Sequence, residues 1–291
     1  MFGAGGQLAS ELATTATAEG VALKGVRRET ADITVSEQIA RAMAETGPSL
    51  AINAAAYNLV DKAESEPGRA MAVNGDGPGM LAAACVAAGV PLVHISTDYV
   101  FDGEKTGPYR EDDPVAPTGA YGRSKAAGEA AVRDAMPDHL ILRTAWLFGI
   151  HGSNFLKTVL RLAAERDAID MVADQVGSPT STRDLARAIL IAAEAIDRGT
   201  AQWGTYHVAG SGAASRHDFA SRIVEVQARF TARRPRVNPV MGARLPAAAR
   251  RPKNSVLDSA KFATVFGFHA ADWRSEVDRV VTQLFAPGGK P

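Results

Sequence analysis

The sequence predicts an α/β fold in which a doubly wound parallel sheet is combined with a smaller α/β lobe. In the first half, short apolar runs alternate with longer helical patterns, and this alternation is typical of parallel strands joined by helices. The apolar runs are nearly unbroken, as expected for strands that are buried on both faces. In the second half, helical patterns near 155–164 and 217–228 are separated by proline-rich stretches, which indicates a second, smaller unit.

The composition is that of a globular chain with enough apolar material for a sizeable core. The 291 residues are 46% hydrophobic and 22% charged, which suits one large domain or two modest ones. Thirty-two basic and 32 acidic residues cancel, so the net charge gives no reason to expect nucleic acid or an anionic membrane as a partner. No apolar stretch reaches the ~20 residues of a spanning helix, and no signal peptide is evident. We expect a cytoplasmic protein.

Four apolar runs are expected to form the strands of the sheet. In an open parallel sheet, ligands bind beyond the carboxyl ends of the strands. Segments 54–58, 96–98 and 144–146 fall at such ends, so they are candidates for a binding site. The expected strands are 21–26, 50–56, 91–96 and 139–143.

A glycine-rich turn stands at the very start of the chain. Gly3, Gly5 and Gly6 precede a helical pattern over 10–18, and such a turn lets backbone amides approach a pyrophosphate at the positive end of a helix. Only two residues precede Gly3, whereas a normal strand has about five or six. We expect an incomplete or wrongly assigned start; the alternative is a first strand that is nearly absent.

The residues after the second expected strand bear on cofactor choice. Lys24, Arg27 and Arg28 come before the next acid, Glu29, and cations at this place suit the extra phosphate of NADP, although a solvated run of charges would have the same appearance. Asp32 could approach the adenine side of a dinucleotide or cap the helix that follows.

Tyr121 and Lys125 have the spacing that brings two side chains to one face of a helix. A tyrosine has a pKa of about 10, and a nearby fixed cation lowers it, so that the phenol can act as a general acid or base. An isolated pair of this kind is usually part of an ordinary amphipathic helix. Here the pair follows a strand that ends in Ser96, Thr97 and Asp98, and this order favours an oxidoreductase active site.

Three other residues that could carry chemistry are interpreted as structural. Cys85 is the only cysteine and lies in an alanine-rich helical segment without a histidine or acidic neighbour, so we expect a buried thiol. His94 and His207 lie in apolar, strand-like segments and are also expected to be structural.

These motifs resemble those of the extended short-chain dehydrogenase/reductases, and within them the dTDP-4-dehydrorhamnose reductase family. The similarity extends from Gly3 to about Val280. The Tyr121 and Lys125 motif marks only the superfamily, whereas Asp-Gln-Val-Gly-Ser-Pro-Thr at 174–180 and Arg-Pro-Lys-Asn-Ser at 251–255 point to the narrower group. Ala9, where the superfamily motif ends in glycine, and Asn58, where relatives often have threonine, depart from the pattern.

The resemblance implies a Rossmann domain over 1–149, which also uses about 180–209, and a mainly substrate-binding lobe over 150–291. It implies catalytic roles for Thr97, Tyr121 and Lys125, and contacts to the nucleotide sugar from Thr97, Asp98 and Trp146. The implied cofactor-binding residues are Gly3, Gly6, Gln7, Leu8, Asp32, Ile33, Ala56, Tyr57, Asn58, Tyr121 and Lys125. Some family members hold Mg²⁺ at a dimer contact, for which Glu11 is a ligand by position. A single carboxylate does not make such a site, so no metal ligand is assigned.

The implied reaction is reduction of the 4-keto group of dTDP-4-dehydro-L-rhamnose by NADPH or NADH, in a monomer or homodimer. Tyr121 would donate a proton, Thr97 would polarise the carbonyl, and Lys125 would lower the pKa of the tyrosine and hold the nicotinamide ribose. The basic residues at 250, 251 and 253 could bind the diphosphate or form a solvated loop. Two alternatives stay open: another nucleotide-sugar reductase or epimerase of the superfamily, and a non-catalytic regulatory subunit with the same fold.

Overall fold

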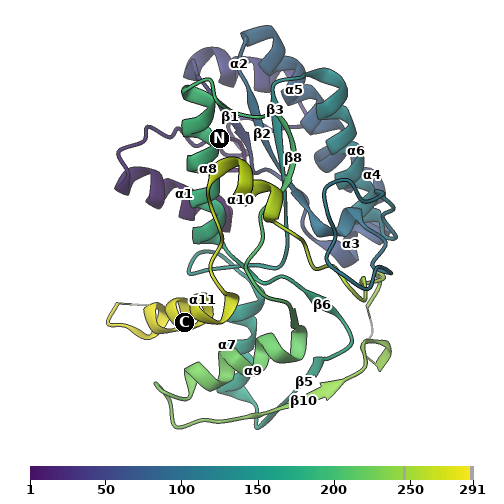
Figure 1. The fold of residues 1–291 in the computed structure, drawn as a ribbon, viewed down its shortest axis with the longest axis vertical. Helices are drawn as coiled ribbons and strands as arrows, with labels where there is room; N and C mark the ends of the chain where they lie inside the picture. The colour runs from purple at the N-terminus through teal and green to yellow at the C-terminus, as the bar shows by residue number, and fades with distance from the viewer. Residues whose placement is uncertain (245–246, 289–291) are drawn as a thin grey trace.

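The computed structural model describes residues 1–244 and 247–288, which form a large and a small lobe (Figure 1). The large lobe is built around a parallel sheet whose strands lie in the order β1, β2, β3 and β8. This sheet confirms the predicted parallel α/β architecture. Its strands are β1 (Ala51–Asn53), β2 (Leu92–Thr97), β3 (His139–Thr144) and β8 (Gly204–His207).

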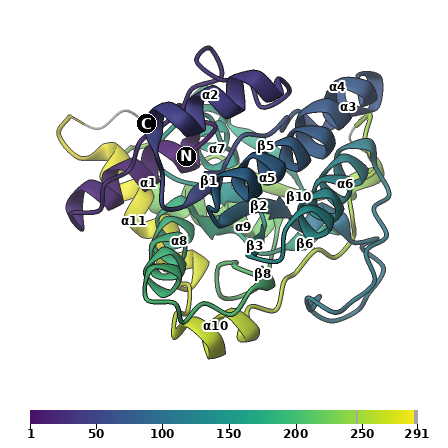
Figure 2. The same ribbon diagram turned by 90° about the horizontal axis from the view of Figure 1, so that it is seen from above.

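Helices cover both faces of the sheet (Figure 2). One face is covered by α1 (Gln7–Ala18) and α8 (Thr182–Asp197), which pack against each other. The other face carries α2 (Ser36–Thr46), α5 (Gly77–Ala88) and α6 (Ala120–Ala135). The sheet is therefore doubly wound, as the sequence predicts.

Successive residues of each strand point to opposite faces and enter two separate hydrophobic clusters. In β3, Leu140 and Leu142 pack with the residues of α1 and α8, whereas Ile141 packs with those of α2 and α5. In β2, Val93 joins the first cluster and Leu92 the second. Because both faces are covered, the residues that enter these clusters are apolar, whereas His94 and Arg143 are buried with polar side-chain partners.

The start of the chain occupies a position in this sheet, but it is only two residues long there. Phe2 forms parallel bridges to Val26 on one side and to Asn53 on the other. The expected strand at 21–26 is wrong, because only Val26 has a bridge and 21–25 have no strand structure. A strand needs a hydrogen-bonded neighbour, and Met1 and Phe2 are too short to pair with the whole of 21–26.

Short helices connect the strands and bring later parts of the chain back to the large lobe. After β1 come α3 (Val60–Ser65), α4 (Pro67–Met71) and a π-helix, Ala72–Asp76. Near the end of the chain, α10 (Ala260–Phe266) packs against β8 and α8. The large lobe thus receives 260–266 in addition to α8 and β8.

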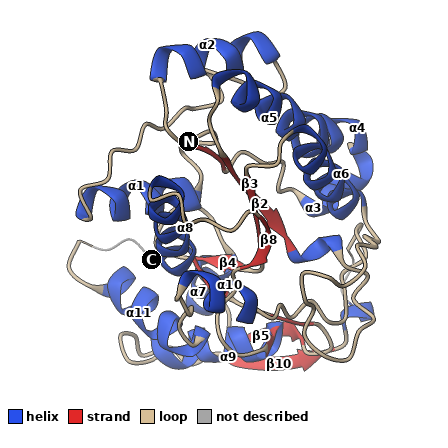
Figure 3. Ribbon diagram, turned by 45° about the horizontal axis from the view of Figure 1, so that its top comes forward, coloured by secondary structure: helices blue, strands red, loops and turns tan. Residues whose placement is uncertain are grey.

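In the described residues, the small lobe combines α-helices with a pair of parallel strands (Figure 3). Phe219 and Trp273 are fully buried at the centre of its hydrophobic cluster. Its elements are α7 (Phe155–Glu165), β5 (Ala168–Val172), α9 (Arg216–Gln227), β10 (Arg236–Val240) and α11 (Trp273–Phe285). Two-stranded pairs connect it to the large lobe, namely β4 (Leu147–Phe148) with β7 (Thr180–Ser181), and β6 (Val176–Gly177) with β9 (Ala214–Ser215).

In the described part of the chain, no helix combines the length and the apolar character that crossing a membrane requires.

Candidate active site

Helix α6 places Tyr121 and Lys125 against the carboxyl end of β2. Helix α6 lies in close contact with the backbone of two neighbouring segments, because glycine occupies both contact positions. A Cβ at Gly122 would collide with the carbonyl oxygen of Tyr99, and one at Gly128 would collide with that of Asn74. These backbone contacts of α6 therefore determine how far Tyr121 and Lys125 extend toward β2.

Tyr121 is buried beside Thr97 and Tyr99. Its ring makes an edge-on contact with the ring of Tyr99, with 5.6 Å between centroids. Burial raises the pKa of the Tyr121 phenol, and a hydrogen bond with Thr97 only partly offsets this, while the charge of Asp98 raises it further. Lys125, which was expected to lower this pKa, is not among the groups that shift it. At neutral pH the phenol holds its proton.

Lys125 is 2% exposed, and its ammonium donates to the carbonyl oxygen of Ile95 at 2.7 Å. This bond directs the charge to β2 rather than to Tyr121, which explains why the expected effect on the tyrosine is missing. Burial lowers the pKa of Lys125 to about 8, and the negative charge of Glu129 opposes that lowering. Glu129 thus helps to keep the lysine charged near neutral pH.

Glu129, one turn after Lys125, belongs to a buried network that sequence reasoning missed. Its carboxylate accepts from Nε and Nη2 of Arg143 at 2.9 and 2.7 Å, and from the hydroxyl of Ser96 at 2.6 Å. Arg143 lies on β3 and is 2% exposed. This charge-assisted, bidentate pair ties α6 to two strands directly beneath the candidate site.

Asn74 is a second site residue that sequence reasoning missed. Its side chain accepts from the backbone N–H of Tyr57 at 2.8 Å and donates to the carbonyl of Tyr57 and to the hydroxyl of Ser124. Asn74 therefore fixes the loop after β1 relative to α6. The only signal in the sequence is a polar residue within an apolar helical stretch.

Thr97 and Asp98 end β2 and face the same region as Tyr121. The Thr97 hydroxyl donates to Oδ1 of Asp98 at 2.9 Å and accepts from the N–H of Tyr99 at 3.2 Å. Burial raises the pKa of Asp98 to about 6, against the lowering effect of hydrogen bonds from Ser255 and Thr97.

The glycine-rich turn fits an anionic ligand such as a dinucleotide diphosphate. Gly3 has a positive φ of 89°, and a side chain there would strike the backbone at 54–55. Helix α1 begins after Gly6 without a side-chain cap and without an acidic residue in its first turn, so its amide dipoles favour an anion. In the described part of the chain, the buried Oε1 of Gln7 has no hydrogen-bond partner, and Leu8 is packed in the core.

Arg27 lies beside this turn. A Cβ at Gly5 would lie 3.2 Å from Nη1 of Arg27, so the guanidinium lies over the glycines. Arg28 instead pairs with Asp32 at 2.9 Å. Asp32 also accepts from the N–H and hydroxyl of Thr34 in the turn before α2. It does not cap that helix, whose N-cap is Val35 without a side-chain hydrogen bond.

The other residues expected at the cofactor lie on two loops of the large lobe. Ile33 is 5% exposed and packs in the cluster under α2 and α5. Ala56 and Tyr57 follow β1, and the Tyr57 hydroxyl donates to Glu66 at 2.9 Å, while Asn58 is exposed. The structure thus brings Ala56, Tyr57 and Asn58 to the same sheet edge as Thr97, but leaves Ile33 in the core.

Trp146 lies at the passage from the large lobe to the small lobe. Its φ of 44° is the only positive value of a non-glycine residue in the described chain. The guanidinium carbon of Arg216, the first residue of α9, lies 3.4 Å from the centroid of the indole ring. Arg216 was not singled out from the sequence, because α9 comes from the other lobe and only the fold brings it to Trp146.

Arg216 also forms a hydrogen bond with Tyr99 and interacts electrostatically with Asp98 and Arg251. Burial lowers the pKa of the Arg216 guanidinium, and the like charge of Arg251 lowers it further. The interactions with Tyr99 and Asp98 raise it. Arg251 forms an ion pair with Asp61 at 2.8 Å. Two guanidinium groups therefore lie near each other between the lobes, and this is an arrangement that an anion would stabilise.

The basic residues considered for the diphosphate and the carboxylate considered for a metal ion pair with protein side chains in this structure. Arg250 and Lys253 both pair with the exposed Glu104. Glu11 is 7% exposed and accepts from the hydroxyl of Thr182 at 3.1 Å. Within 1–244 and 247–288, no three His, Cys, Asp or Glu side chains are grouped as metal ligands.

Cys85, His94 and His207 are fully buried in the core of the large lobe. Burial raises the pKa of the Cys85 thiol to about 12 and lowers the pKa of both imidazoles, that of His207 to about 3. His94 contacts the side chain of Asn53, and His207 contacts the carbonyl of Tyr109. These contacts agree with structural roles.

A doubly wound sheet, a glycine turn at its first helix and a Tyr-x-x-x-Lys helix beside the end of β2 define an extended short-chain dehydrogenase/reductase. The sequence profile described as "RmlD substrate binding domain" matches residues 1–285. The chain belongs to this family, whose curated relatives carry the name dTDP-4-dehydrorhamnose reductase.

Two relatives show how far the sequence similarity extends. The dTDP-4-dehydrorhamnose reductase of Sinorhizobium fredii is 41% identical, over 98% of this chain and 97% of its own. That of Mycolicibacterium smegmatis is 44% identical, over 97% of this chain and 84% of its own. The similarity is therefore not confined to the motifs of the active site.

Solved structures give the same result. The dTDP-4-dehydrorhamnose reductase of Clostridium acetobutylicum has a TM-score of 0.90 at 38% identity, with 97% of this chain and 98% of that chain covered. The enzyme of Bacillus anthracis, solved in complex with NADP, has a TM-score of 0.89 at 36% identity, with 97% of each chain covered. A UDP-glucose 4-epimerase of Brucella ovis, at 20% identity, shares the fold.

Proposed function

We propose that this protein reduces the 4-keto group of dTDP-4-dehydro-L-rhamnose with NADPH to give dTDP-L-rhamnose, a step of dTDP-rhamnose biosynthesis. The observation that carries the proposal is the convergence of Thr97 and Tyr121 at the end of β2, with Lys125 one turn further along α6. The names of the full-length relatives support the choice of substrate, and the NADP complex of the Bacillus anthracis relative supports the choice of cofactor.

The large lobe would hold the nicotinamide cofactor. The turn at 3–6 and the amino end of α1 would bind the diphosphate, and Arg27, above Gly5, would bind the additional phosphate of NADPH through charge-assisted hydrogen bonds. Lys125 would reach the nicotinamide ribose from its buried place on α6. NADPH, when bound, would supply the hydride that the carbonyl carbon of the sugar accepts.

Tyr121 would transfer its phenolic proton to the carbonyl oxygen as this oxygen becomes an alkoxide. Burial raises the pKa of this phenol, so the proton is present at neutral pH, as reduction requires. Thr97 would release its hydrogen bond to Asp98 and donate its one hydroxyl proton to the same oxygen, which stabilises the developing charge. Lys125, whose charge Glu129 helps to maintain, would act through the nicotinamide ribose rather than on the phenolate, because its ammonium is directed to the Ile95 carbonyl.

The nucleotide part of the substrate would lie between the lobes. Arg216 and Arg251 offer two guanidinium groups to a diphosphate, and planar bidentate contacts suit this ligand. Asp98 and Trp146 would border the sugar and the base. In this division, 1–149 together with about 180–209 would bind the cofactor, and the rest of 150–291 would mainly bind the substrate.

The test is NADPH oxidation by the purified chain with dTDP-4-dehydro-L-rhamnose, followed by identification of the product. Tyr121→Phe removes the proton donor and should lower kcat by about 10²-fold or more, while the Kd for NADPH stays within about twofold. Tyr206→Phe is the matched control, since this hydroxyl donates to the carbonyl of Gln202 far from the site.

Full turnover by the Tyr121→Phe variant would refute the assignment of the proton donor. Turnover with another nucleotide sugar but not with the dTDP sugar would leave the chemistry in place and reject the substrate. Binding of NADPH without turnover of any nucleotide sugar would favour the regulatory alternative.

A further inference from the structure

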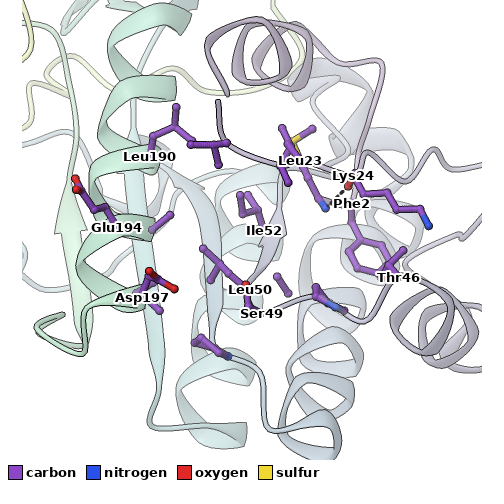
Figure 4. A pocket seen from close by; sticks show the side chains of 18 of the residues that line it. Phe2, Leu23, Lys24, Thr46, Ser49, Leu50, Ile52, Leu190, Glu194 and Asp197 are labelled. Carbon is purple, nitrogen blue, oxygen red and sulfur yellow. Dashed lines mark hydrogen bonds between the residues drawn. The ribbon is translucent and has the colours of Figure 1, made fainter. Parts of the chain in front are cut away.

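Side chains at the junction of the two lobes, rather than the cavity of the large lobe, are placed to recognise a substrate. The cavity has a volume of ≈ 1100 Å³ and an apolar lining that includes Leu23, Leu50, Ile52 and Leu190 (Figure 4). Pro91, the residue before β2, also lines it, so the cavity lies at the amino ends of the strands. Ligands of an open parallel sheet bind beyond the carboxyl ends, where Trp146 meets Arg216.

Gly177 of β6 lies against one face of the indole ring of Trp146. A Cβ at Gly177 would be 2.5 Å from Cε2 of the indole and 2.8 Å from both Nε1 and Cζ2, the two atoms that flank Cε2 on the edge of the ring. A position beyond this edge would be nearer to one of the flanking atoms than to Cε2. The backbone of Gly177 is therefore stacked on the face of the indole, and it comes so close because glycine has no side chain.

Arg216 covers the opposite face of the same indole. Its guanidinium carbon lies 3.4 Å from the centroid of the ring, which is van der Waals contact. All three atoms nearest to a Cβ at Gly177 belong to the indole; if the guanidinium were on that face, its carbon would be nearer than they are. Both faces of Trp146 are thus occupied by the protein, and a nucleobase could stack on it only by displacing Arg216.

Further contacts fix the guanidinium of Arg216 at this place. The ring of Phe155 lies 5.0 Å from its carbon, and Phe155 stacks on Phe219 in the core of the small lobe, with 5.4 Å between centroids. A cation–π contact becomes stronger when the cation is withdrawn from water, and Arg216 is half-buried. Trp146 and the small lobe therefore hold the same cation.

The charge of Arg216 is not neutralised by a direct ion pair with any of the residues that the structure describes. Asp98 acts on it through its charge and Tyr99 through a hydrogen bond, while the like charge of Arg251 opposes it. In the described chain, the buried Nη1 of Arg251 has no hydrogen-bond partner. Two guanidinium groups, one of them with an unused donor, suit the two phosphates of a diphosphate.

Trp146 adopts a backbone conformation that favours glycine. Its φ of 44° costs free energy in a residue that has a Cβ, and such strain persists only where the surrounding contacts determine it. Here these contacts come from Gly177 and Arg216 on the two faces of the ring. The strained backbone therefore places the indole between them.

We propose that Trp146 is a positioning residue, which holds Arg216 as the group that binds the diphosphate of the substrate and does not itself stack on the base. This inference rests on the proposed function, in which the substrate is a dTDP sugar. A guanidinium that is already fixed loses less conformational freedom when a ligand binds. Removal of the indole therefore weakens the binding of a diphosphate as such, whatever base it carries.

The test measures binding rather than turnover, with dTDP and inorganic pyrophosphate as the probes. Both are titrated calorimetrically into the purified protein at saturating NADP⁺, which keeps the glycine-rich turn occupied. Trp146→Leu should raise the Kd of both probes by the same factor, about tenfold, because both carry the diphosphate. In an Arg216→Gln background, the same substitution should change either Kd by less than about twofold, because no guanidinium is left to hold.

Trp203→Leu is the matched control, because Trp203 is exposed and precedes the amino end of β8; both Kd values should stay unchanged. A larger loss for dTDP than for pyrophosphate would show that Trp146 stacks on the base. Equal losses in the wild-type and Arg216→Gln backgrounds would show that the two side chains bind independently. Either result overturns the positioning role, as does wild-type affinity of Trp146→Leu for both probes.

If Trp146→Leu does not fold, Arg216→Lys decides the same question. Lysine keeps the charge but cannot stack as a plane on the indole, so both Kd values should rise about fivefold or more; wild-type affinity would overturn the proposal. A wild type that binds pyrophosphate with this dependence but does not bind dTDP rejects the proposed substrate and retains the positioning role. A wild type that binds neither probe overturns both.

Discussion

Replacing Asp98 by asparagine should change the pH dependence of stability in a defined direction. Asp98 is 2% exposed, and burial raises the pKa of its carboxyl from 3.8 to about 6. Because the folded-state pKa lies above the unfolded one, the folded protein binds more protons between about pH 4 and pH 6. The contribution of Asp98 to the free energy of unfolding therefore falls as the pH rises through this window.

The magnitude follows from the size of the pKa change. A rise from 3.8 to about 6 corresponds to about 3 kcal/mol, which the wild type loses between about pH 4 and pH 7. The Asp98→Asn variant carries no ionisable group at this position. Whatever the substitution costs at pH 4, the variant should gain about 3 kcal/mol relative to the wild type by pH 8.

The assay is urea unfolding at a series of pH values, followed by circular dichroism. The difference between variant and wild type is plotted against pH, because the other carboxyl groups then cancel. Asp134→Asn, at an exposed position near the end of α6, is the control and should give a flat difference. A flat difference for Asp98→Asn, or one that favours the wild type as the pH rises, would refute the reasoning.

Three further substitutions test other parts of the site. Arg27→Gln should raise the KM for NADPH about tenfold and leave the KM for NADH nearly unchanged; equal effects in steady-state kinetics would argue against a contact with the additional phosphate. Glu129→Gln leaves the buried Arg143 without its carboxylate and should lower the free energy of unfolding by about 3 kcal/mol or more; a loss below about 1 kcal/mol in urea would contradict this. Gly128→Ala introduces a collision with a carbonyl of the π-helix; it should lower the free energy of unfolding by about 1–3 kcal/mol and also lower turnover. Gly68→Ala is the control, because no atom lies within 4 Å of the new Cβ; it should change neither the free energy of unfolding nor turnover.

The parts of the site that the sequence predicts depend on local geometry. The expected strand at 91–96 is β2, Leu92–Thr97, and the spacing of Tyr121 and Lys125 places both on α6. Periodicity is sufficient for these features, because strand ends and helix faces are properties of a single segment. Their roles in catalysis stay predictions that the kinetic tests decide.

The features that the sequence did not predict depend on contacts between distant segments. Arg216 reaches Trp146 only because the small lobe folds over the large one. The pKa of Tyr121 is raised rather than lowered because burial outweighs the other influences, and Lys125 is bonded to Ile95. Burial and hydrogen-bond partners cannot be derived from spacing along the chain.

The expected strand at 21–26 failed for a related reason. Its apolar sequence is suitable for a strand, but strand structure is a property of pairs. Met1 and Phe2 pair with only its last residues, so the suitable sequence has no partner along most of its length.

The glycines of α6 have a consequence for how this protein tolerates mutation. At Gly122 and Gly128 the helix rests on carbonyl oxygens of neighbouring segments, and backbone atoms cannot repack as side chains do. The proton donor also packs on Tyr99, and Arg216 of the small lobe bonds to that residue. Changes in the small lobe that leave Arg216 in place can therefore alter ligand preference while the two glycines hold α6, whereas changes at Arg216 affect both.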